Sequence, residues 1–297
     1  MTDIVLITSY MRPEFLSLCL EYLSKAEGAR DGKEFWLCHD FRKDDDHRHT
    51  ADLRWLNEVI ENSPLPLRVV RRAPHMFPGN SYNTLEAYKE AYETKAEKVF
   101  LVEDDCLVTE DFFRWHEAVQ TAEPNLMCSV GYRCIRNSEA RKDVTDPAAF
   151  FVSARDYASI GVCWRREELG PVVEHARPEY YANPGNYLDT RFPSDVYSGW
   201  YHEQDGAIMR ILHEQKKYVA WSYVPRIYHV GNIGYHRPSG VRANGQLRDK
   251  IQTLRSWIHD ANMLKIVAPD FGDIEPVPTE PTPAWSAEDL YCVQRFE

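Results

Sequence analysis

Strand-like and helix-like segments alternate along the first 115 residues, and this alternation constrains the fold more than any other feature. Short runs of β-branched and apolar residues, typical of buried parallel strands, lead into segments with apolar residues at helical spacing. The expected strands lie at 3–10, 34–40, 67–73 and 98–105, and the expected helices at 14–26, 51–63 and 81–96. Successive strand–helix–strand units imply right-handed crossovers. The sequence therefore predicts an α/β fold with a mostly parallel sheet and helices on both faces.

The second half of the chain has a less regular pattern. Strands are expected at 125–133 and 159–166, and one or two more at 217–230. Helices are expected at 166–176 and 202–215. A Pro-rich stretch at 275–285 is expected to be extended and to lie on the surface.

Composition limits the classes of function. The chain has 297 residues and is 43% hydrophobic, which is enough for one large domain or two small ones. A net charge of −11 argues against general nucleic-acid binding, but residues 226–255 are basic and suit a small anionic ligand. Seven scattered cysteines suggest free thiols in a reducing compartment. With no run of eighteen apolar residues and no leader-like N-terminus, we expect a cytoplasmic protein without a membrane span.

Three adjacent carboxylates, Glu103, Asp104 and Asp105, follow the fourth expected strand. In open parallel sheets, ligands bind beyond the carboxyl ends of the strands, so these acids are well placed for a site. Carboxylate oxygens suit Mg²⁺, Mn²⁺ or Ca²⁺, whose remaining positions are often taken by substrate phosphates. A solvated acidic turn is the alternative interpretation. The apolar strand before the acids and the helix after them favour the metal site.

Here the chain resembles a known family. VFLVEDDCLVTEDFFRW, residues 99–115, resembles the metal-binding DxD segment of nucleotide-sugar glycosyltransferases with the GT-A fold. The N-acetylglucosaminyltransferase I type is the most similar. Residues 4–23 are similar to the opening strand and helix of that fold, which the family-2 transferases share. The resemblance covers about residues 3–135 well and 155–236 loosely.

Two further segments extend the resemblance into the nucleotide pocket. FWLCHD, residues 35–40, resembles the second strand, whose terminal Asp reads the uracil ring. HMFPGNSYNTLEAY, residues 75–88, resembles a His-x-x-x-Gly segment of the same pocket. The resemblance implies that Asp105 coordinates the metal, whereas Glu103 and Asp104 contact the sugar and ribose. The other implied donor contacts are Thr8, Tyr10, Arg12, Asp40 and His75. His75 as an ordinary loop histidine and Asp40 as a turn cap remain the alternatives.

A catalytic base is expected in the second half. An inverting transfer needs a carboxylate that takes the proton of the acceptor hydroxyl. Asp205 and Glu203 lie at the start of the 202–215 helix, whose N-terminus favours ionised carboxylates. Asp205 is the first choice and Glu203 the alternative, and one of the two is expected to be only a helix cap.

The basic segment supplies the remaining candidates. By resemblance, His229 is the expected further metal ligand and His236 its competitor. The Gly- and Arg-rich loop that follows offers Arg237 and Arg242 for charge-assisted contacts to a diphosphate, unless it is only a solvated surface loop. Residues 180–201 are unusually aromatic and could form an acceptor wall or an irregular hydrophobic mini-core.

The resulting hypothesis is a metal-dependent, inverting glycosyltransferase that uses Mn²⁺ or Mg²⁺ and a nucleotide sugar, preferably a UDP-sugar. Its acceptor is a hydroxyl group, on a glycan or another molecule. We expect a nucleotide-sugar-binding half at 1–125, an acceptor and catalytic half of the same domain at 126–265, and a Pro-rich extension at 266–297. A viral-type enzyme that glycosylates a hydroxymethylated DNA base and a non-catalytic nucleotide-sugar-binding module are the alternatives.

Overall fold

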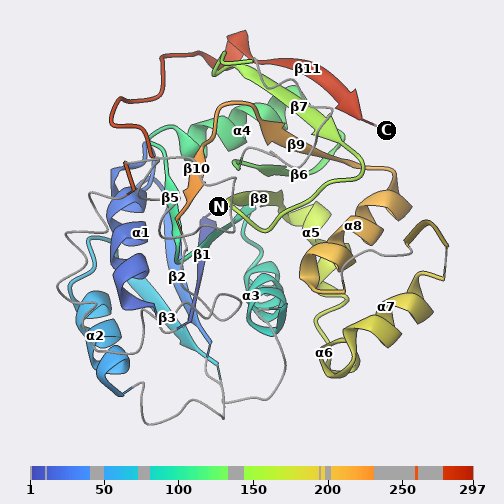
Figure 1. The fold of residues 1–297 in the computed structure, drawn as a ribbon, viewed down its shortest axis with the longest axis horizontal. Helices are drawn as coiled ribbons and strands as arrows, with labels where there is room; N and C mark the ends of the chain where they lie inside the picture. Colours follow the sequence, from blue (N-terminus) through green and yellow to red (C-terminus); the bar gives the residue numbers. More distant parts are fainter. Residues whose placement is uncertain are drawn as a thin grey trace.

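The structure is a computed structural model. It describes residues 2–10, 12–40, 50–72, 81–132, 144–193, 195–197, 202–230, 258–259 and 277–296. Within these ranges, its centre is a nine-stranded sheet with the order β11-β7-β9-β6-β8-β4-β1-β2-β3 (Figure 1). The strands are β1 Asp3–Ser9, β2 Lys33–His39, β3 Leu67–Arg71, β4 Lys98–Glu103, β6 Leu126–Val130, β7 Ala149–Ser153, β8 Val162–Arg165, β9 Tyr218–Ser222 and β11 Tyr291–Phe296.

The first four strands form the parallel half of this sheet. β1 pairs in parallel with both β2 and β4, and β2 pairs in parallel with β3. The sheet continues into the second half of the chain, where β8 lies antiparallel between β4 and β6. β9 is parallel to β6 and antiparallel to β7. The predicted α/β class with a mostly parallel sheet is therefore confirmed.

Helices cover both faces of the sheet, as the period-two alternation of buried strand residues requires. On one face, Val5 and Ile7 of β1 share a core with α1 (Pro13–Lys25), α2 (Thr50–Glu61) and α4 (Phe112–Ala122). On the other face, Ile4 and Leu6 share a core with α3 (Ser81–Glu93), α5 (Arg166–Val173) and α8 (Gln204–Gln215). None of the helices in the described residues is long and apolar enough to cross a membrane.

A short antiparallel ribbon of β5 (Cys106–Val108) and β10 (Ile227–His229) lies beside the main sheet. In its register, His229 pairs with Cys106 and Ile227 pairs with Val108. The sequence predicted one or two strands for 217–230 but no strand directly after the acids. The ribbon matters because it brings His229 next to the acidic turn.

The aromatic segment 180–201 forms two short helices in its described part, with α6 at Pro178–Ala182 and α7 at Pro184–Arg191. Its rings are mostly turned inward, since Tyr180 is fully buried and Tyr181 is 3% exposed. The packing favours the hydrophobic mini-core over the acceptor wall.

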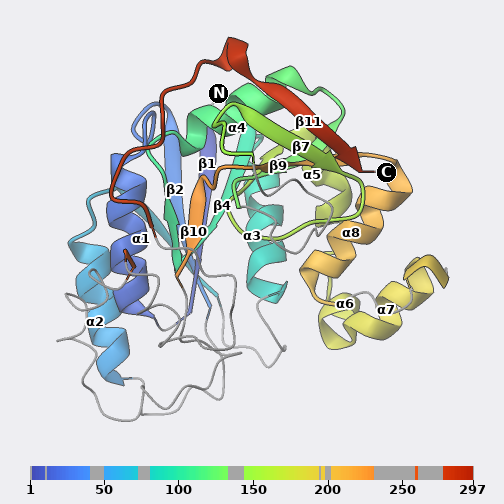
Figure 2. The same cartoon turned by 45° about the horizontal axis from the view of Figure 1, so that its top comes forward.

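The C-terminal segment is more tightly attached than the sequence suggested. Residues 277–285 contain no helix or strand, as predicted, but Trp285 is only 7% exposed. Its indole nitrogen donates to Asp111 Oδ2 at 2.6 Å, and Arg226 Nε lies 3.0 Å from the same oxygen. Figure 2 shows β11, which the sequence did not predict, alongside β7 at the edge of the sheet.

The turn before β8 offers a test of this packing. Gly161 has φ +62°, and a Cβ at this position would meet Ile227 side-chain atoms at 2.8 Å. Gly32 has φ +67°, but nothing lies within 4 Å of its added Cβ. Gly32→Ala should therefore lower the free energy of unfolding by about 1–2 kcal/mol through backbone strain alone. Gly161→Ala should lower the free energy of unfolding by about 1–3 kcal/mol more than Gly32→Ala does, because the added methyl group overpacks the contact with Ile227. Urea unfolding of both variants measures the difference, and equal losses would contradict the packing of β10 on this turn.

Candidate active site

The carboxyl edge of the parallel strands gathers the functional candidates. Ser81, the first residue of α3, donates from Oγ to Gln204 Oε1 at 2.6 Å, so the first turns of α3 and α8 meet. Asn83 Nδ2 donates to the carbonyl of Cys38 at 2.9 Å and fixes α3 to the end of β2. Helix α8, from the second half of the chain, therefore begins at the edge where β1, β2 and β4 end.

The acidic turn after β4 is held by backbone hydrogen bonds on both sides. Asp104 N–H donates to the carbonyl of Thr8 at 2.9 Å, which ties the turn to β1. Val230 N–H donates to the carbonyl of Asp105 at 2.9 Å, which ties it to the residue after β10. The positions of all three acids are thus fixed by strand pairing rather than by a solvated loop.

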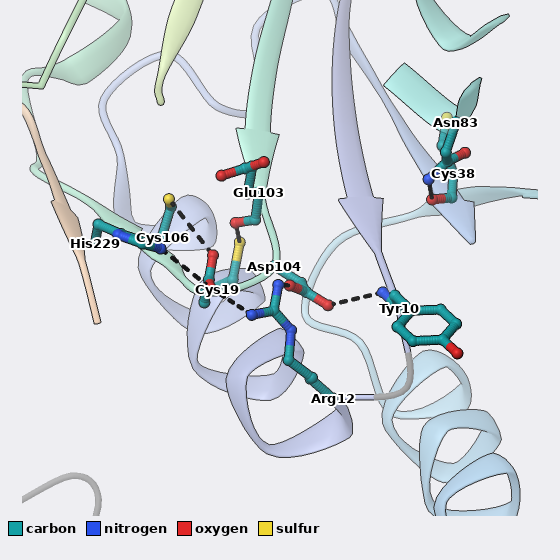
Figure 3. A network of polar contacts seen from close by, with 10 residues as sticks. Tyr10, Arg12, Cys19, Cys38, Asn83, Glu103, Asp104, Cys106 and His229 are labelled. Carbon is teal, nitrogen blue, oxygen red and sulfur yellow. Dashed lines mark hydrogen bonds and ion pairs between the residues drawn. The ribbon is translucent and has the colours of Figure 1, made fainter. Parts of the chain in front are cut away.

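Arg12 bridges two of the acids from the N-cap position of α1. Its guanidinium donates to Asp104 Oδ1 and, at 2.5 Å, to Asp105 Oδ2 (Figure 3). The Tyr10 N–H adds a hydrogen bond to Asp104 Oδ2 at 3.1 Å. Asp104 is fully buried and Asp105 is 3% exposed. Buried charges of this kind require a partner, and Arg12 supplies it.

A second set of contacts joins the acids to the ribbon. His229 Nε2 lies 3.2 Å from Asp105 Oδ2. Glu103, Asp105 and His229 each offer one ligand atom, and these atoms lie within 4.8 Å of one another. Asp104 does not belong to this group, because its two oxygens face Arg12 and Tyr10. The structure therefore groups Glu103 with the expected ligands, whereas the resemblance placed Glu103 and Asp104 together as substrate contacts.

The protonation of the acids reflects their crowding. Burial would raise the pKa of Asp105, but the charges of Arg12 and His229 outweigh it and hold this pKa well below its usual range. Burial and the neighbouring Asp105 raise the pKa of Glu103 to about 8. Burial raises the pKa of Asp104 to about 6, against the effect of Arg12. Near neutral pH Asp105 is therefore ionised, whereas Glu103 holds its proton more tightly than an exposed glutamate does.

This donor set fits a divalent ion. Two carboxylates suit Mg²⁺ or Mn²⁺, and the imidazole shifts the preference towards a transition metal such as Mn²⁺. Only part of a coordination shell comes from the protein, so room would remain for substrate oxygens.

Asp205 and Glu203 take different positions at the start of α8. Asp205 lies in the first turn and accepts a hydrogen bond from Ser159 Oγ at 2.5 Å. The pKa of Glu103 is raised mainly by burial and by the charge of Asp105. The charge of Asp205 raises it further, so Asp205 and Glu103 interact electrostatically. Glu203 is the N-cap residue, is exposed, and makes no side-chain cap hydrogen bond. Of the two, Asp205 is half-buried and Glu203 is exposed.

Two of the expected nucleotide contacts lie at the same edge. Thr8 is 6% exposed and Asp40 is 5% exposed, and Asp40 N–H donates to the carbonyl of Ser9 at 2.9 Å. His75, His236, Arg237 and Arg242 lie outside the described residues. Sequence reasoning missed Ser159, which belongs to no motif and lies 46 positions before Asp205.

Comparison with solved structures identifies the class of fold. The structure of S. aureus TarS in complex with UDP-GlcNAc matches 93% of this chain and 68% of its own, with a TM-score of 0.50 and 12% identity. The chain has a GT-A fold. A mannosyltransferase from Pyrobaculum calidifontis, in complex with GDP-Man and Mn²⁺, covers 93% of this chain and 76% of its own, at 14% identity and a TM-score of 0.45. No protein-family model and no curated protein matches the sequence.

Removal of Arg12 tests the charge balance of the site. In buffer with a chelator, Arg12→Ala should lower the free energy of unfolding by about 3–5 kcal/mol, because it leaves buried carboxylates unpaired. Lys25→Ala is the matched control, since Lys25 pairs with Glu21 at 2.8 Å on the surface. The control should change stability by at most about 0.5 kcal/mol. Urea unfolding measures both, and a loss as small as that of the control would refute the role of Arg12.

Proposed function

We propose that this protein is a metal-dependent glycosyltransferase that takes a sugar from a nucleotide sugar, preferably a UDP-sugar, and inverts it onto an acceptor hydroxyl. The observation that carries the proposal is the group formed by Glu103, Asp105 and His229 at the carboxyl edge of a GT-A sheet. The UDP-GlcNAc bound to TarS, which shares the fold, supports this class of donor.

The proposed division of labour among the acids follows their contacts. Asp105, His229 and Glu103 would hold Mn²⁺ or Mg²⁺, which supplies Lewis-acid stabilisation of the departing diphosphate when it is bound. Asp104 orients the turn through Arg12 and Tyr10. Arg12 offers its positive charge next to the position that this proposal gives to the diphosphate. This scheme moves Glu103 from a sugar contact to a ligand and leaves Asp104 a structural role.

The nucleoside is assigned to the neighbouring strand ends. Thr8 lies near the end of β1, Tyr10 directly follows β1, and Asp40 directly follows β2, so all three lie at the edge of the sheet where Arg12 bridges the acids. His75, Arg237 and Arg242 complete the proposed donor contacts from segments outside the described residues. A cytoplasmic location remains our expectation from the sequence.

Asp205 is the proposed base, and Glu203 remains the alternative. In an inverting transfer the base removes the acceptor proton while the oxygen attacks the anomeric carbon from the face opposite the leaving nucleotide. Asp205 suits this role because it lies in the first turn of α8, where the helix N-terminus stabilises an ionised carboxylate. Its electrostatic interaction with Glu103 supports the proposal that it acts beside the acids.

Ligand binding tests the proposal without knowledge of the acceptor. UDP or a UDP-sugar together with Mn²⁺ should raise the melting temperature, because a ligand at 100 times its Kd adds about 2.7 kcal/mol of stability. Asp105→Asn should abolish the part of this shift that needs Mn²⁺. Asp31→Asn, which changes an exposed carboxylate in a turn, should keep it. Thermal shift with a panel of nucleotides and nucleotide sugars measures the effect, and a panel without any Mn²⁺-dependent shift would rule out the proposed donor site.

Turnover distinguishes the two candidate bases. Asp205→Asn should lower kcat by about 10²–10⁴-fold, the usual contribution of a general base, while the KM for the donor stays near its original value. Glu203→Gln should change kcat only a few-fold, because the exposed Glu203 side chain does not point into the hydrogen-bonded interior of the site. Steady-state kinetics of sugar transfer or donor hydrolysis measures both. The opposite pattern would assign the base to Glu203.

A further inference from the structure

A chain of hydrogen-bonding side chains runs from the core of the protein to Asp205. It begins at Trp164 on β8, whose Nε1 donates to the Tyr88 hydroxyl on α3 at 3.1 Å. The Tyr88 and Tyr157 hydroxyls lie 3.5 Å apart, and the Tyr157 hydroxyl lies 3.3 Å from Ser159 Oγ. Ser159 Oγ donates to Asp205 Oδ1 at 2.5 Å. Side chains from α3, from β8 and from the segment before β8 are therefore linked, through Ser159, to one carboxylate oxygen.

The members of this chain are shielded from water and remain protonated. Tyr88 and Trp164 are fully buried, Ser159 is 4% exposed and Tyr157 is 7% exposed. Burial raises the pKa of both Tyr88 and Tyr157 well above that of an exposed tyrosine. At neutral pH each hydroxyl consequently carries one hydrogen that it can donate.

The two ends of the chain determine its direction. An indole nitrogen can only donate, and an ionised carboxylate can only accept. Because Trp164 donates to Tyr88, the hydrogen of Tyr88 is available for Tyr157, and that of Tyr157 for Ser159. The single hydrogen of Ser159 then points to Asp205. Ser159 could also donate its hydrogen to the Tyr157 hydroxyl at 3.3 Å. In that case the shorter, part-buried contact with Asp205 Oδ1 at 2.5 Å would bring two acceptors together without a hydrogen, so the hydrogen of Ser159 points to Asp205.

We propose that Ser159 is the positioning residue for Asp205 and that it is the last donor of a hydrogen-bond chain directed from Trp164 through Tyr88 and Tyr157. The proposal rests on the proposed function, in which Asp205 takes the acceptor proton. Ser159 holds Oδ1 and so fixes the plane of the carboxylate and the direction of its other oxygen. The aligned hydroxyls polarise one another and stabilise the ionised form that a base requires.

The chain also explains an otherwise costly arrangement. Two tyrosine hydroxyls and a serine hydroxyl are buried between α3, α8 and the turn before β8, where each would lose stability without a partner. In a directed chain every hydroxyl both donates once and accepts once. With Asp205 as the final acceptor, the hydrogen-bond chain links the core of the protein to the site.

Kinetics of single and double variants test the proposal. Ser159→Ala removes a hydrogen bond to a charged group and should lower kcat by about 10- to 100-fold with little change in donor KM. Ser159→Thr, which keeps the hydroxyl, should recover most of the activity. Tyr157→Phe should lower kcat by about 2- to 5-fold, and it should have no further effect in the Ser159→Ala background, because the chain is already interrupted there.

A matched control separates this pattern from a general loss of packing. Tyr223→Phe also removes the hydroxyl of a buried tyrosine, which donates to Gln294 of β11 at 2.6 Å, and it should leave kcat unchanged. Full kcat in Ser159→Ala would overturn the proposal. So would independent, additive effects of Ser159→Ala and Tyr157→Phe.

An NMR measurement tests the chain without any activity. In ¹H–¹⁵N spectra, the indole N–H resonance of Trp164 should shift in Asp205→Asn and in Ser159→Ala, because both changes remove the polarising end of the chain. Asp189→Asn, on the exposed face of α7, should leave it in place. An unchanged Trp164 resonance would refute the chain. If the resonance shifts but the wild-type protein transfers no sugar, the proposed function fails and the catalytic role of Ser159 fails with it, while the hydrogen-bond chain stands.

Discussion

The three adjacent carboxylates at the end of β4, of which Asp104 and Asp105 are buried and Glu103 is half-buried, are the constraint on which the rest of the site depends. Removing such charges from water is costly, so the surrounding structure has to supply compensation. It does so from distant segments, with Arg12 from the start of α1 and His229 from β10. The sheet pairing of β4 with β1 and the ribbon pairing of β5 with β10 hold these groups in place. The ligand atoms of Glu103, Asp105 and His229, which this arrangement brings within 4.8 Å of one another, are what make the site suitable for a divalent ion.

A second buried ion pair supports the first from the opposite end of β10. Arg226 precedes this strand and is fully buried beside Asp111, at 3.0 Å, while His229 ends the strand beside Asp105. Contacts with a carboxylate therefore hold β10 at both of its ends, to Asp111 at the start and to Asp105 at the end. Trp285 donates to the same Asp111, so the C-terminal segment stabilises the arrangement that positions His229.

The sequence predicted most of the fold because apolar periodicity is a local signal. Each expected strand and helix of the first 115 residues is present, and so is the long helix that carries Asp205. β5, β7 and β11 were missed. β5 has only three residues and so too little pattern, and β7 and β11 pair with strands that are far away in sequence. Within the site, the sequence located the acids but not their individual contacts. Whether Glu103 or Asp104 faces His229 depends on which way the turn points each side chain, and the position of Ser159 depends on tertiary packing alone.

The pairing of β11 with β7 bears on how the molecule is made in a cell. β7 leaves the ribosome long before β11, so its outer edge has unpaired backbone groups while the intervening chain is still being synthesised. Such an edge is a template for pairing with other chains. Synthesis thus passes through a stage in which the outer edge of β7 is open to pairing with another chain. When β11 has been synthesised, it pairs in parallel with β7 and covers this edge, so other chains can no longer pair with it.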